Sequence, residues 1–253
     1  MKTIQTVGIV VGSILMAFGS ASLAVADAKG EKIMREALVK LNSAQAMTAK
    51  FTQTTVAPDQ PFKLTLNGTI AVMKANYIRV RITGETPDHK KIERVYASNG
   101  AEYITYFGEN STYRKDRLDP KPQEFSGEWE AEVDGFFGGV DLLKRGIPVY
   151  KGVDKVGSVP CDVITFNATP RDGVAARVMT YYIGQKDHLF YRASYPVPST
   201  NNVRLTQTNT LSDINLSAKL SVKDFAYTPP SGAKPLRRPR EVIRRNDSRR
   251  SAF

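Results

Sequence analysis

The chain contains one cysteine, Cys161, and two histidines, His89 and His188, among its 253 residues. A single thiol cannot form a disulfide within the chain, and it excludes structural zinc sites built from several cysteines. Both histidines lie in segments predicted to be turns. Neither belongs to a recognised ligand spacing, although His89 and Glu93 are four residues apart. We expect no metal site, and a fold that is held together by packing.

Motifs for catalysis are also scarce. The sequence has no G-x-S-x-G motif, and the glycine-rich stretch 134–144 lacks the G-K-[ST] ending of a phosphate-binding loop. Cys161 begins an apolar strand with no histidine nearby in the sequence, which is typical of an inert small hydrophobic residue. A carboxylate pair for glycoside hydrolysis could come from Glu128, Glu130, Glu132 and Asp134. Acidic residues at a helix start also complement the helix dipole, so a solvated acidic segment is the favoured interpretation. We predict no catalytic residue, no cofactor and no enzymatic activity, with a secreted hydrolase as an alternative.

The first 26 residues have the features of a secretory signal peptide. Lys2 precedes an apolar stretch at 7–23, and Ala24-Val25-Ala26 gives the small-x-small pattern of a cleavage site. A short membrane anchor is the alternative, and the small residues within the apolar stretch disfavour it. No later segment of the sequence is apolar enough to span a bilayer. We expect cleavage near Ala26 and an exported, soluble mature chain that begins at Asp27.

The positive charge is concentrated at the C-terminus. The formal net charge is +11, of which residues 234–253 carry +6 and Lys2 carries +1, leaving +4 for residues 27–233. The tail 234–253 is rich in proline and arginine and poor in apolar residues, so we expect it to be disordered. We expect its arginines to contact anionic membranes, with a merely solvated tail as the alternative and nucleic acid excluded by export. The membrane-contact residues are Arg237, Arg238, Arg240, Arg244 and Arg245.

The spacing of apolar residues predicts one helix followed by many strands. Residues 30–44 carry an apolar stripe at helical spacing, and the period then changes to two. Asn99-Gly100 is a strong hairpin signal, and 108–110 is a second turn. The predicted strands are 47–56, 62–73, 77–82, 92–97, 102–107, 111–115, 149–156, 161–167, 174–183, 189–195, 203–210 and 220–225. The predicted fold class is mainly β (α+β), a large antiparallel sheet with helices against it.

A second helix is predicted at 132–145. Its apolar stripe consists of Val133, Phe136, Phe137, Val140 and Leu143. Three glycines within it weaken the helix by about 1 kcal/mol each relative to alanine. An apolar but weakly stable helix suits a lid over a cavity, and an ordinary core helix is the alternative.

The hairpin strand at 178–183 is apolar on both faces. Met179, Tyr181 and Ile183 lie on one face, and Val178 and Tyr182 lie on the other. A sheet with one face in water would alternate more cleanly, so the second face should touch a helix, another sheet or a ligand. An apolar concavity with few polar groups is typical of a lipid site.

Several segments together resemble a known family. The chain resembles the LolA/LolB-like superfamily, which comprises the periplasmic lipoprotein carriers and their outer-membrane receptor. Three segments carry this resemblance: Phe51-Thr52-Gln53 on the first strand, the two strands in NGTIAVMKANYIRVRI, and the hairpin around Asn99-Gly100. The later segments VDKVGSVPCDVITF, YYIGQKDHLFYRASYP and LSVKDFAYTPPSGAK extend the resemblance over 29–233. In the carriers a Lys-Arg-Pro step provides an arginine that helps to hold the lid closed, whereas this chain has Lys74-Ala75-Asn76.

The resemblance implies an incomplete antiparallel barrel with helices packed in its concave face. It implies a periplasmic, monomeric carrier or binder of lipids or acylated proteins on a domain at 27–233. The signal peptide at 1–26 and the basic tail at 234–253 are predicted from the sequence itself, and the tail is not part of the family pattern. The alternative is a sensor or scaffold on the same fold that binds a protein partner. The expected ligand-binding residues are Phe51, Val133, Phe136, Phe137, Val140, Leu143, Met179, Tyr181 and Ile183.

Overall fold

A computed structural model describes residues 27–117, 139–168, 177–197 and 204–236. The described chain forms helix α1, Ala28–Ser43, then twelve strands and three short 3₁₀-helices. The strands are β1 Ala46–Ala57, β2 Phe62–Met73, β3 Tyr77–Glu85, β4 Lys91–Asn99, β5 Glu102–Phe107, β6 Thr112–Arg117, β7 Gly146–Val156, β8 Val159–Ala168, β9 Arg177–Gly184, β10 Phe190–Val197, β11 Leu205–Asn215 and β12 Lys234–Pro235. The 3₁₀-helices are η1 Gly108–Asn110, η2 Gly139–Arg145 and η3 Val222–Phe225.

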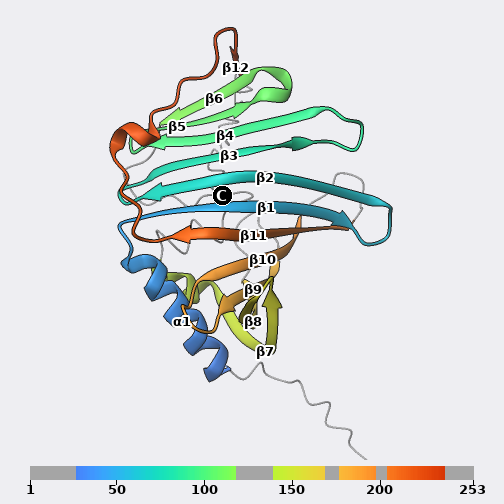
Figure 1. Cartoon of the computed structure of the whole chain (residues 1–253), viewed down its shortest axis with the longest axis vertical. Helices are drawn as coiled ribbons and strands as arrows, with labels where there is room; N and C mark the ends of the chain where they lie inside the picture. The colour runs from blue at the N-terminus through green and yellow to red at the C-terminus, as the bar shows by residue number, and fades with distance from the viewer. Residues whose placement is uncertain (1–26, 118–138, 169–176, 198–203, 237–253) are drawn as a thin grey trace, which may run out of the picture.

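The described strands form one open sheet in the order β12-β6-β5-β4-β3-β2-β1-β11-β10-β9-β8-β7. Sequential strands pair as antiparallel hairpins, and the antiparallel β1–β11 ladder joins the two halves. Strands β7 and β12 lie at opposite ends of the sheet (Figure 1), so the sheet is not closed into a barrel. The predicted large antiparallel sheet is confirmed, and an open sheet is consistent with an incomplete barrel.

Helix α1 begins where Asp27 caps it. The Asp27 carboxylate accepts hydrogen bonds from the backbone N–H of Lys29 and from that of Tyr150 on β7. The Tyr150 contact, as the largest cause, lowers the pKa of Asp27 below its usual value. Gly30 lies so close to β7 that an added Cβ would be 2.8 Å from the Tyr150 nitrogen. The start of α1 is therefore fixed against the edge of the sheet.

One face of the sheet, called here the inner face, shares a single apolar core with α1. The helix contributes a buried stripe of Ile33, Met34, Ala37, Leu38 and Leu41. The sheet contributes inward residues at every second position, including Phe51, Ile70, Val80 and Ile164. Helix α1 contacts β7, β8 and β9 at the lower end of the sheet in Figure 1.

The two apolar faces of β9 have different surroundings. Tyr181 and Ile183 are buried in the inner core, and Met179 packs against it. On the outer face Val178 is 54% exposed, and the Arg192 guanidinium lies 5.0 Å from the ring centre of Tyr182. Within the described residues, the second face of this strand therefore contacts a cation rather than a helix or another sheet.

The strand predicted at 220–225 is wrong. Val222–Phe225 instead form η3, because Ser221 and Asp224 make a reciprocal capping box. The segment crosses the outer face, where the buried Phe225 ring lies 5.5 Å from that of Tyr77. Beyond it, Lys234 and Pro235 pair in parallel with β6, so the described sheet extends past Ala233. The division into leader, domain and tail otherwise stays a prediction.

The described part of the predicted second helix is η2, a 3₁₀-helix rather than an α-helix. Gly139 has a φ of +53°, a left-handed conformation that a continuous α-helix cannot contain. Val140 and Leu143 lie on η2 and pack against the inner core. The predicted lid residues Val133, Phe136 and Phe137 lie outside the described residues. Among the described helices, none is long and apolar enough to cross a membrane.

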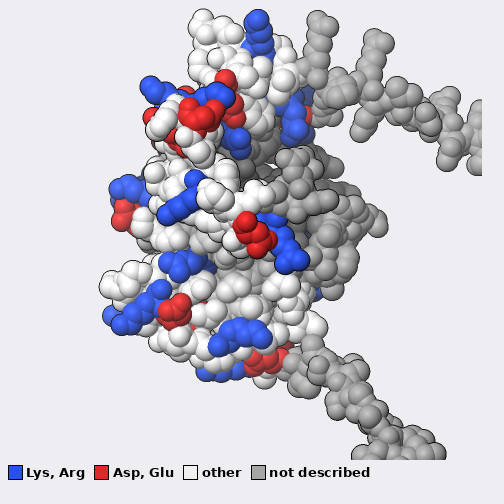
Figure 2. Space-filling model, turned by 90° about the vertical axis from the view of Figure 1, so that its right-hand side faces the viewer, with Lys and Arg blue, Asp and Glu red and all other residues white. Residues whose placement is uncertain are grey.

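Charged side chains of both signs are distributed over the described surface. In the view of Figure 2, blue Lys and Arg groups lie beside red Asp and Glu groups at several places. Exposed ion pairs include Lys50–Asp213 at 2.9 Å and Lys115–Glu102 at 2.9 Å. The tail arginines from Arg237 to Arg245 lie outside the described residues, so their role stays a prediction.

Candidate functional site

An apolar cleft lies between the C-terminal half of α1 and the sheet. It is lined by Leu41, Met47, Leu189, Phe190, Leu211 and Ile214. Its free volume is about 10 Å³, which is roughly the room that one water molecule needs. The cleft is thus nearly closed, and α1 has to move away from the sheet before a larger ligand can enter.

A larger cavity, the helix cavity, lies at the other end of α1, beside η2 and β7. Its volume is about 370 Å³, within the range of small-ligand sites. The charged lining residues are Asp27, Glu31, Arg35, Asp141 and Lys144, and the apolar ones include Val140, Leu143, Ile147 and Pro148. The lining charges pair within the cavity, Arg35 with Glu31 at 2.5 Å and Lys144 with Asp141 at 2.7 Å.

The predicted ligand-binding residues fall into two groups. Phe51, Met179, Tyr181 and Ile183 belong to the inner core, where the Tyr181 ring makes edge contacts with Phe166 and Phe190. Val140 and Leu143 line the helix cavity. The first group shares the inner core with α1, the second lies beside α1, and the role of both in binding stays a prediction.

Four buried polar residues, called here the polar cluster, were not predicted from the sequence. They are Gln53 on β1, Tyr195 on β10, and Gln207 and Asn209 on β11. The Gln207 side-chain amide donates to the Tyr195 hydroxyl at 2.7 Å, and the Asn209 amide donates to it at 3.3 Å. The Gln53 amide nitrogen is buried and has no hydrogen-bond partner among the described residues. Its position in phase with Phe51 along β1 was the signal that could have revealed it.

Lys74 occupies the segment that departs from the carrier pattern. Its ammonium donates to the backbone oxygen of Asn42 and, at 3.0 Å, to the Asn42 side-chain oxygen. Asn42 lies in the last turn of α1, where a cation complements the helix dipole. Lys74 therefore connects the β2–β3 turn to the C-terminal end of α1.

The described histidines, Glu93 and Cys161 do not lie together in one site. His188 Nδ1 lies 3.7 Å from a Glu36 carboxylate oxygen, and Glu93 pairs with Arg81 at 2.9 Å rather than with His89. Burial raises the pKa of the Cys161 thiol, which disfavours the reactive thiolate. Within the described ranges, no three His, Cys, Asp or Glu side chains form a metal cluster. Glu128 and Glu130 lie outside those ranges.

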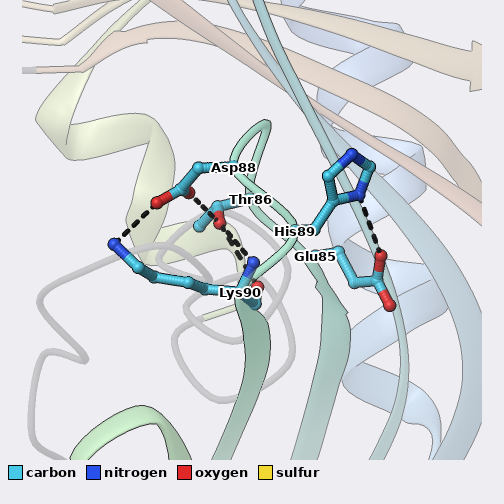
Figure 3. Close-up of polar contacts among 5 residues, drawn as sticks. All are labelled: Glu85, Thr86, Asp88, His89 and Lys90. Atoms are coloured by element: carbon cyan, nitrogen blue, oxygen red, sulfur yellow. Dashed lines mark hydrogen bonds and ion pairs between the residues drawn. The ribbon is translucent and has the colours of Figure 1, made fainter.

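The β3–β4 turn is closed by its own polar side chains (Figure 3). The Asp88 carboxylate accepts a hydrogen bond from the Thr86 hydroxyl and pairs with the Lys90 ammonium at 2.6 Å. His89 has a φ of +60°, and its Nδ1 lies 3.8 Å from Glu85. The contact with Lys90, as the largest cause, and the hydrogen bond from Thr86 lower the pKa of Asp88 to about 2.

We predict a specific pH dependence for this turn. Because the folded-state pKa of Asp88 is below its usual 3.8, its contacts stabilise the fold above about pH 4, and their contribution is lost as the pH falls through about 2. An NMR titration of the Asp88 carboxyl carbon should give the low value. Lys90→Ala should raise the pKa toward 3.8, whereas Lys91→Ala should leave it unchanged. Titration of wild-type Asp88 near 3.8 would contradict the described turn.

Comparison with known proteins finds likeness only among solved structures. No family model matches the chain, and no curated protein matches it. A LolA superfamily protein from Nitrosomonas europaea is 12% identical, with a TM-score of 0.39, over 78% of this chain and 97% of that one. The lipoprotein LppX from Mycobacterium tuberculosis is 16% identical, with a TM-score of 0.46, over 76% and 98%. The MucA/MucB complex from Pseudomonas aeruginosa is 11% identical, with a TM-score of 0.41, over 79% of this chain and 62% of that one.

LolA superfamily structures are thus among those similar to this chain, as the resemblance in sequence predicted. These identities and TM-scores are too low to indicate what the chain binds. Its function has to be inferred from its own residues.

Proposed function

We propose that the chain is an exported carrier or binder of lipids or lipid-modified proteins. The acyl chains bind between the inner face of the sheet and the helices α1 and η2. The observation that supports this most directly is the apolar cleft, which continues the apolar stripe of α1 across β1, β10 and β11. The helix cavity supplies a charged mouth at the far end of the same helix.

Burial of an acyl chain is comparable in free energy to the exposure of the buried leucines and methionine of α1. Burial of a sixteen-carbon chain contributes roughly 12 kcal/mol, at about 0.8 kcal/mol per CH₂. Full exposure of Met34, Leu38 and Leu41 on α1 would cost roughly 5 to 9 kcal/mol on the same scale. A bound chain would also cover part of these side chains. An acyl chain that replaces the contacts of α1 therefore offsets the exposure of these side chains.

The basic tail assists this function at a membrane surface. Near an anionic bilayer each cationic side chain contributes about 1 kcal/mol, screened over about 8 Å at physiological salt. The proposed contacts, Arg237 to Arg245, would hold the carrier at the surface without anchoring it. The periplasm is the compartment proposed, since the N-terminal segment predicts export.

The test is lipid extraction from the purified mature protein followed by mass spectrometry. We expect acyl lipid in the extract of the wild type and reduced retention in Ile214→Trp, which fills the cleft. The expected loss of affinity is about tenfold, equivalent to about 1.4 kcal/mol. Ser212→Trp, an exposed position on the same strand, is the matched control and should retain lipid. An empty wild type that also binds no fluorescent diacyl phospholipid would refute the proposal.

A protein-binding sensor or scaffold is the second candidate. The observation that favours it is β7, an edge strand of the described sheet, with Ile147 40% exposed and Val153 57% exposed. Such an edge can accept a strand from a partner. A sensor would be purified without lipid and would retain a protein partner, and Val153→Lys would release that partner.

A further inference from the structure

The inner face changes from apolar to polar at one step along β1 and β11. Phe51 and Leu211 are cross-strand partners, and Leu211 lines the apolar cleft. The next inward pair along the same strands is Gln53 and Asn209. Tyr195 and Gln207 form the pair after that, between β10 and β11. The polar cluster therefore lies directly beside the apolar pair Phe51 and Leu211 on the inner face.

One side-chain nitrogen of the polar cluster lacks an acceptor among the described residues. The Tyr195 hydroxyl oxygen accepts from both Gln207 and Asn209, and Gln207 also lies 3.5 Å from the Asn209 side-chain oxygen. Gln53 is 2% exposed, and its amide nitrogen has no hydrogen-bond partner in the part of the chain that the structure describes. A buried donor without an acceptor is destabilising, and natural proteins rarely contain one without a reason.

We propose that Gln53 binds the carbonyl oxygen of an acyl ester or amide, with the hydrocarbon chain along the apolar inner face toward α1. This inference rests on the proposed function and names the part of the ligand that the polar cluster recognises. A carbonyl oxygen supplies the acceptor that the Gln53 amide lacks. The change at the Phe51–Leu211 pair places hydrocarbon and carbonyl on opposite sides of one boundary.

The chemistry of the polar cluster selects a neutral acceptor. All four side chains are uncharged, and three are amides. A carboxylate or phosphate buried among them would lack a cation in the cluster and would carry a large desolvation cost. An ester or amide carbonyl avoids that cost, whereas an ether oxygen is a weaker acceptor. The cluster therefore distinguishes acylated molecules from alkyl ethers and from free fatty-acid anions.

The test compares two lipids that differ only in the linkage. Delipidated protein is mixed with equal amounts of dipalmitoyl and dihexadecyl-ether phosphatidylglycerol, and the bound lipid is quantified by mass spectrometry. One net hydrogen bond corresponds to an enrichment of about 2- to 10-fold for the ester in the wild type. Gln53→Leu should bind both lipids equally, and Gln53→Met should do the same if the leucine variant folds poorly. Thr54→Val, the adjacent outward position, is the matched control and should keep the enrichment.

The outcomes separate this inference from the proposed function. Enrichment that persists in both Gln53 variants would overturn the inference. Uptake of both lipids by the wild type without preference would overturn it too, while leaving the carrier function intact. If the wild type takes up neither lipid, both the inference and the proposed carrier function are overturned. A diacylated cysteine peptide competed against the free diacyl lipid then shows whether the carbonyl comes from a lipoprotein or from a membrane lipid.

Thermal unfolding without lipid provides a second readout. Removal of an unpartnered buried donor should raise the melting temperature, so delipidated Gln53→Leu should melt above the wild type. A purely structural amide would instead leave its partners unsatisfied when removed and lower the melting temperature. A lower value in both Gln53→Leu and Gln53→Met would overturn the assignment.

Discussion

Replacement of Leu38 by alanine is expected to reduce the free energy of unfolding by about 2 to 5 kcal/mol. Leu38 is fully buried in the middle of α1, within the core shared by the helix and the sheet. The loss combines the transfer free energy of the missing atoms with the cavity that remains, because the flanking strands β7, β8 and β9 are fixed by their ladders. Urea unfolding followed by circular dichroism measures the change.

Val39 provides the matched control on the same turn of the helix. Its side chain is 54% exposed, so Val39→Ala should change the free energy of unfolding by no more than about 0.5 kcal/mol. Equal effects of the two substitutions would show that α1 does not pack against the sheet in solution. Saturating lipid should recover part of the loss in Leu38→Ala, since a ligand that binds only the folded state stabilises it.

The second large effect is expected for Gly68→Ala. An added Cβ would lie 2.2 Å from the backbone oxygen of Arg81 and 2.2 Å from Cζ of the Phe51 ring. Gly68 is the cross-strand partner of both Phe51 and Ile82, so neither strand can shift without breaking its ladder. Overpacking of this kind costs about 1 to 3 kcal/mol, and for a protein of this size each kcal/mol lowers the melting temperature by roughly 2 to 4 °C.

Gly84→Ala is the comparison for this prediction. The closest atom to its added Cβ is Cδ2 of Leu66, the end of a flexible side chain, at 2.5 Å. Rotation of Leu66 can relieve that contact, so Gly84→Ala should destabilise the protein less than Gly68→Ala. The reverse order in differential scanning calorimetry would show that the Phe51 ring does not lie across β2.

Turn residues explain why most strand positions could be predicted from the sequence. Period-two alternation located β2 and β5 with the bounds that the structure has. Asn99-Gly100 and Gly108 flank β5 and stop its pairing abruptly. Alternation was misleading at Leu220 to Phe225, where Ser221 and Asp224 stabilise a capped turn instead. The spacing S-x-x-D that forms the capping box was present in the sequence at Ser221 and Asp224.

The candidate site was less predictable because it depends on pairing between distant strands. Phe51 and Tyr181 could be assigned to a common apolar face from alternation alone. Nothing local indicates that Gln53 on β1 faces Asn209 on β11, since that register is set by the whole ladder. A buried polar cluster also violates the rule that inward positions are apolar, and functional sites are where such violations are expected.

The position of β11 in the sheet has a consequence for how the chain folds. Strands β1 to β6 and β7 to β10 can each form from neighbouring hairpins, but the sheet becomes continuous only when Thr48 meets Asn215 and Val56 meets Thr206. Ladders between such distant segments form slowly, because a long loop must close before any contact is gained. Until then β1 exposes an unpaired edge beside the longest apolar strands, and that intermediate is prone to aggregate. Synthesis or export that stops before β11 would leave the molecule in two halves that cannot join.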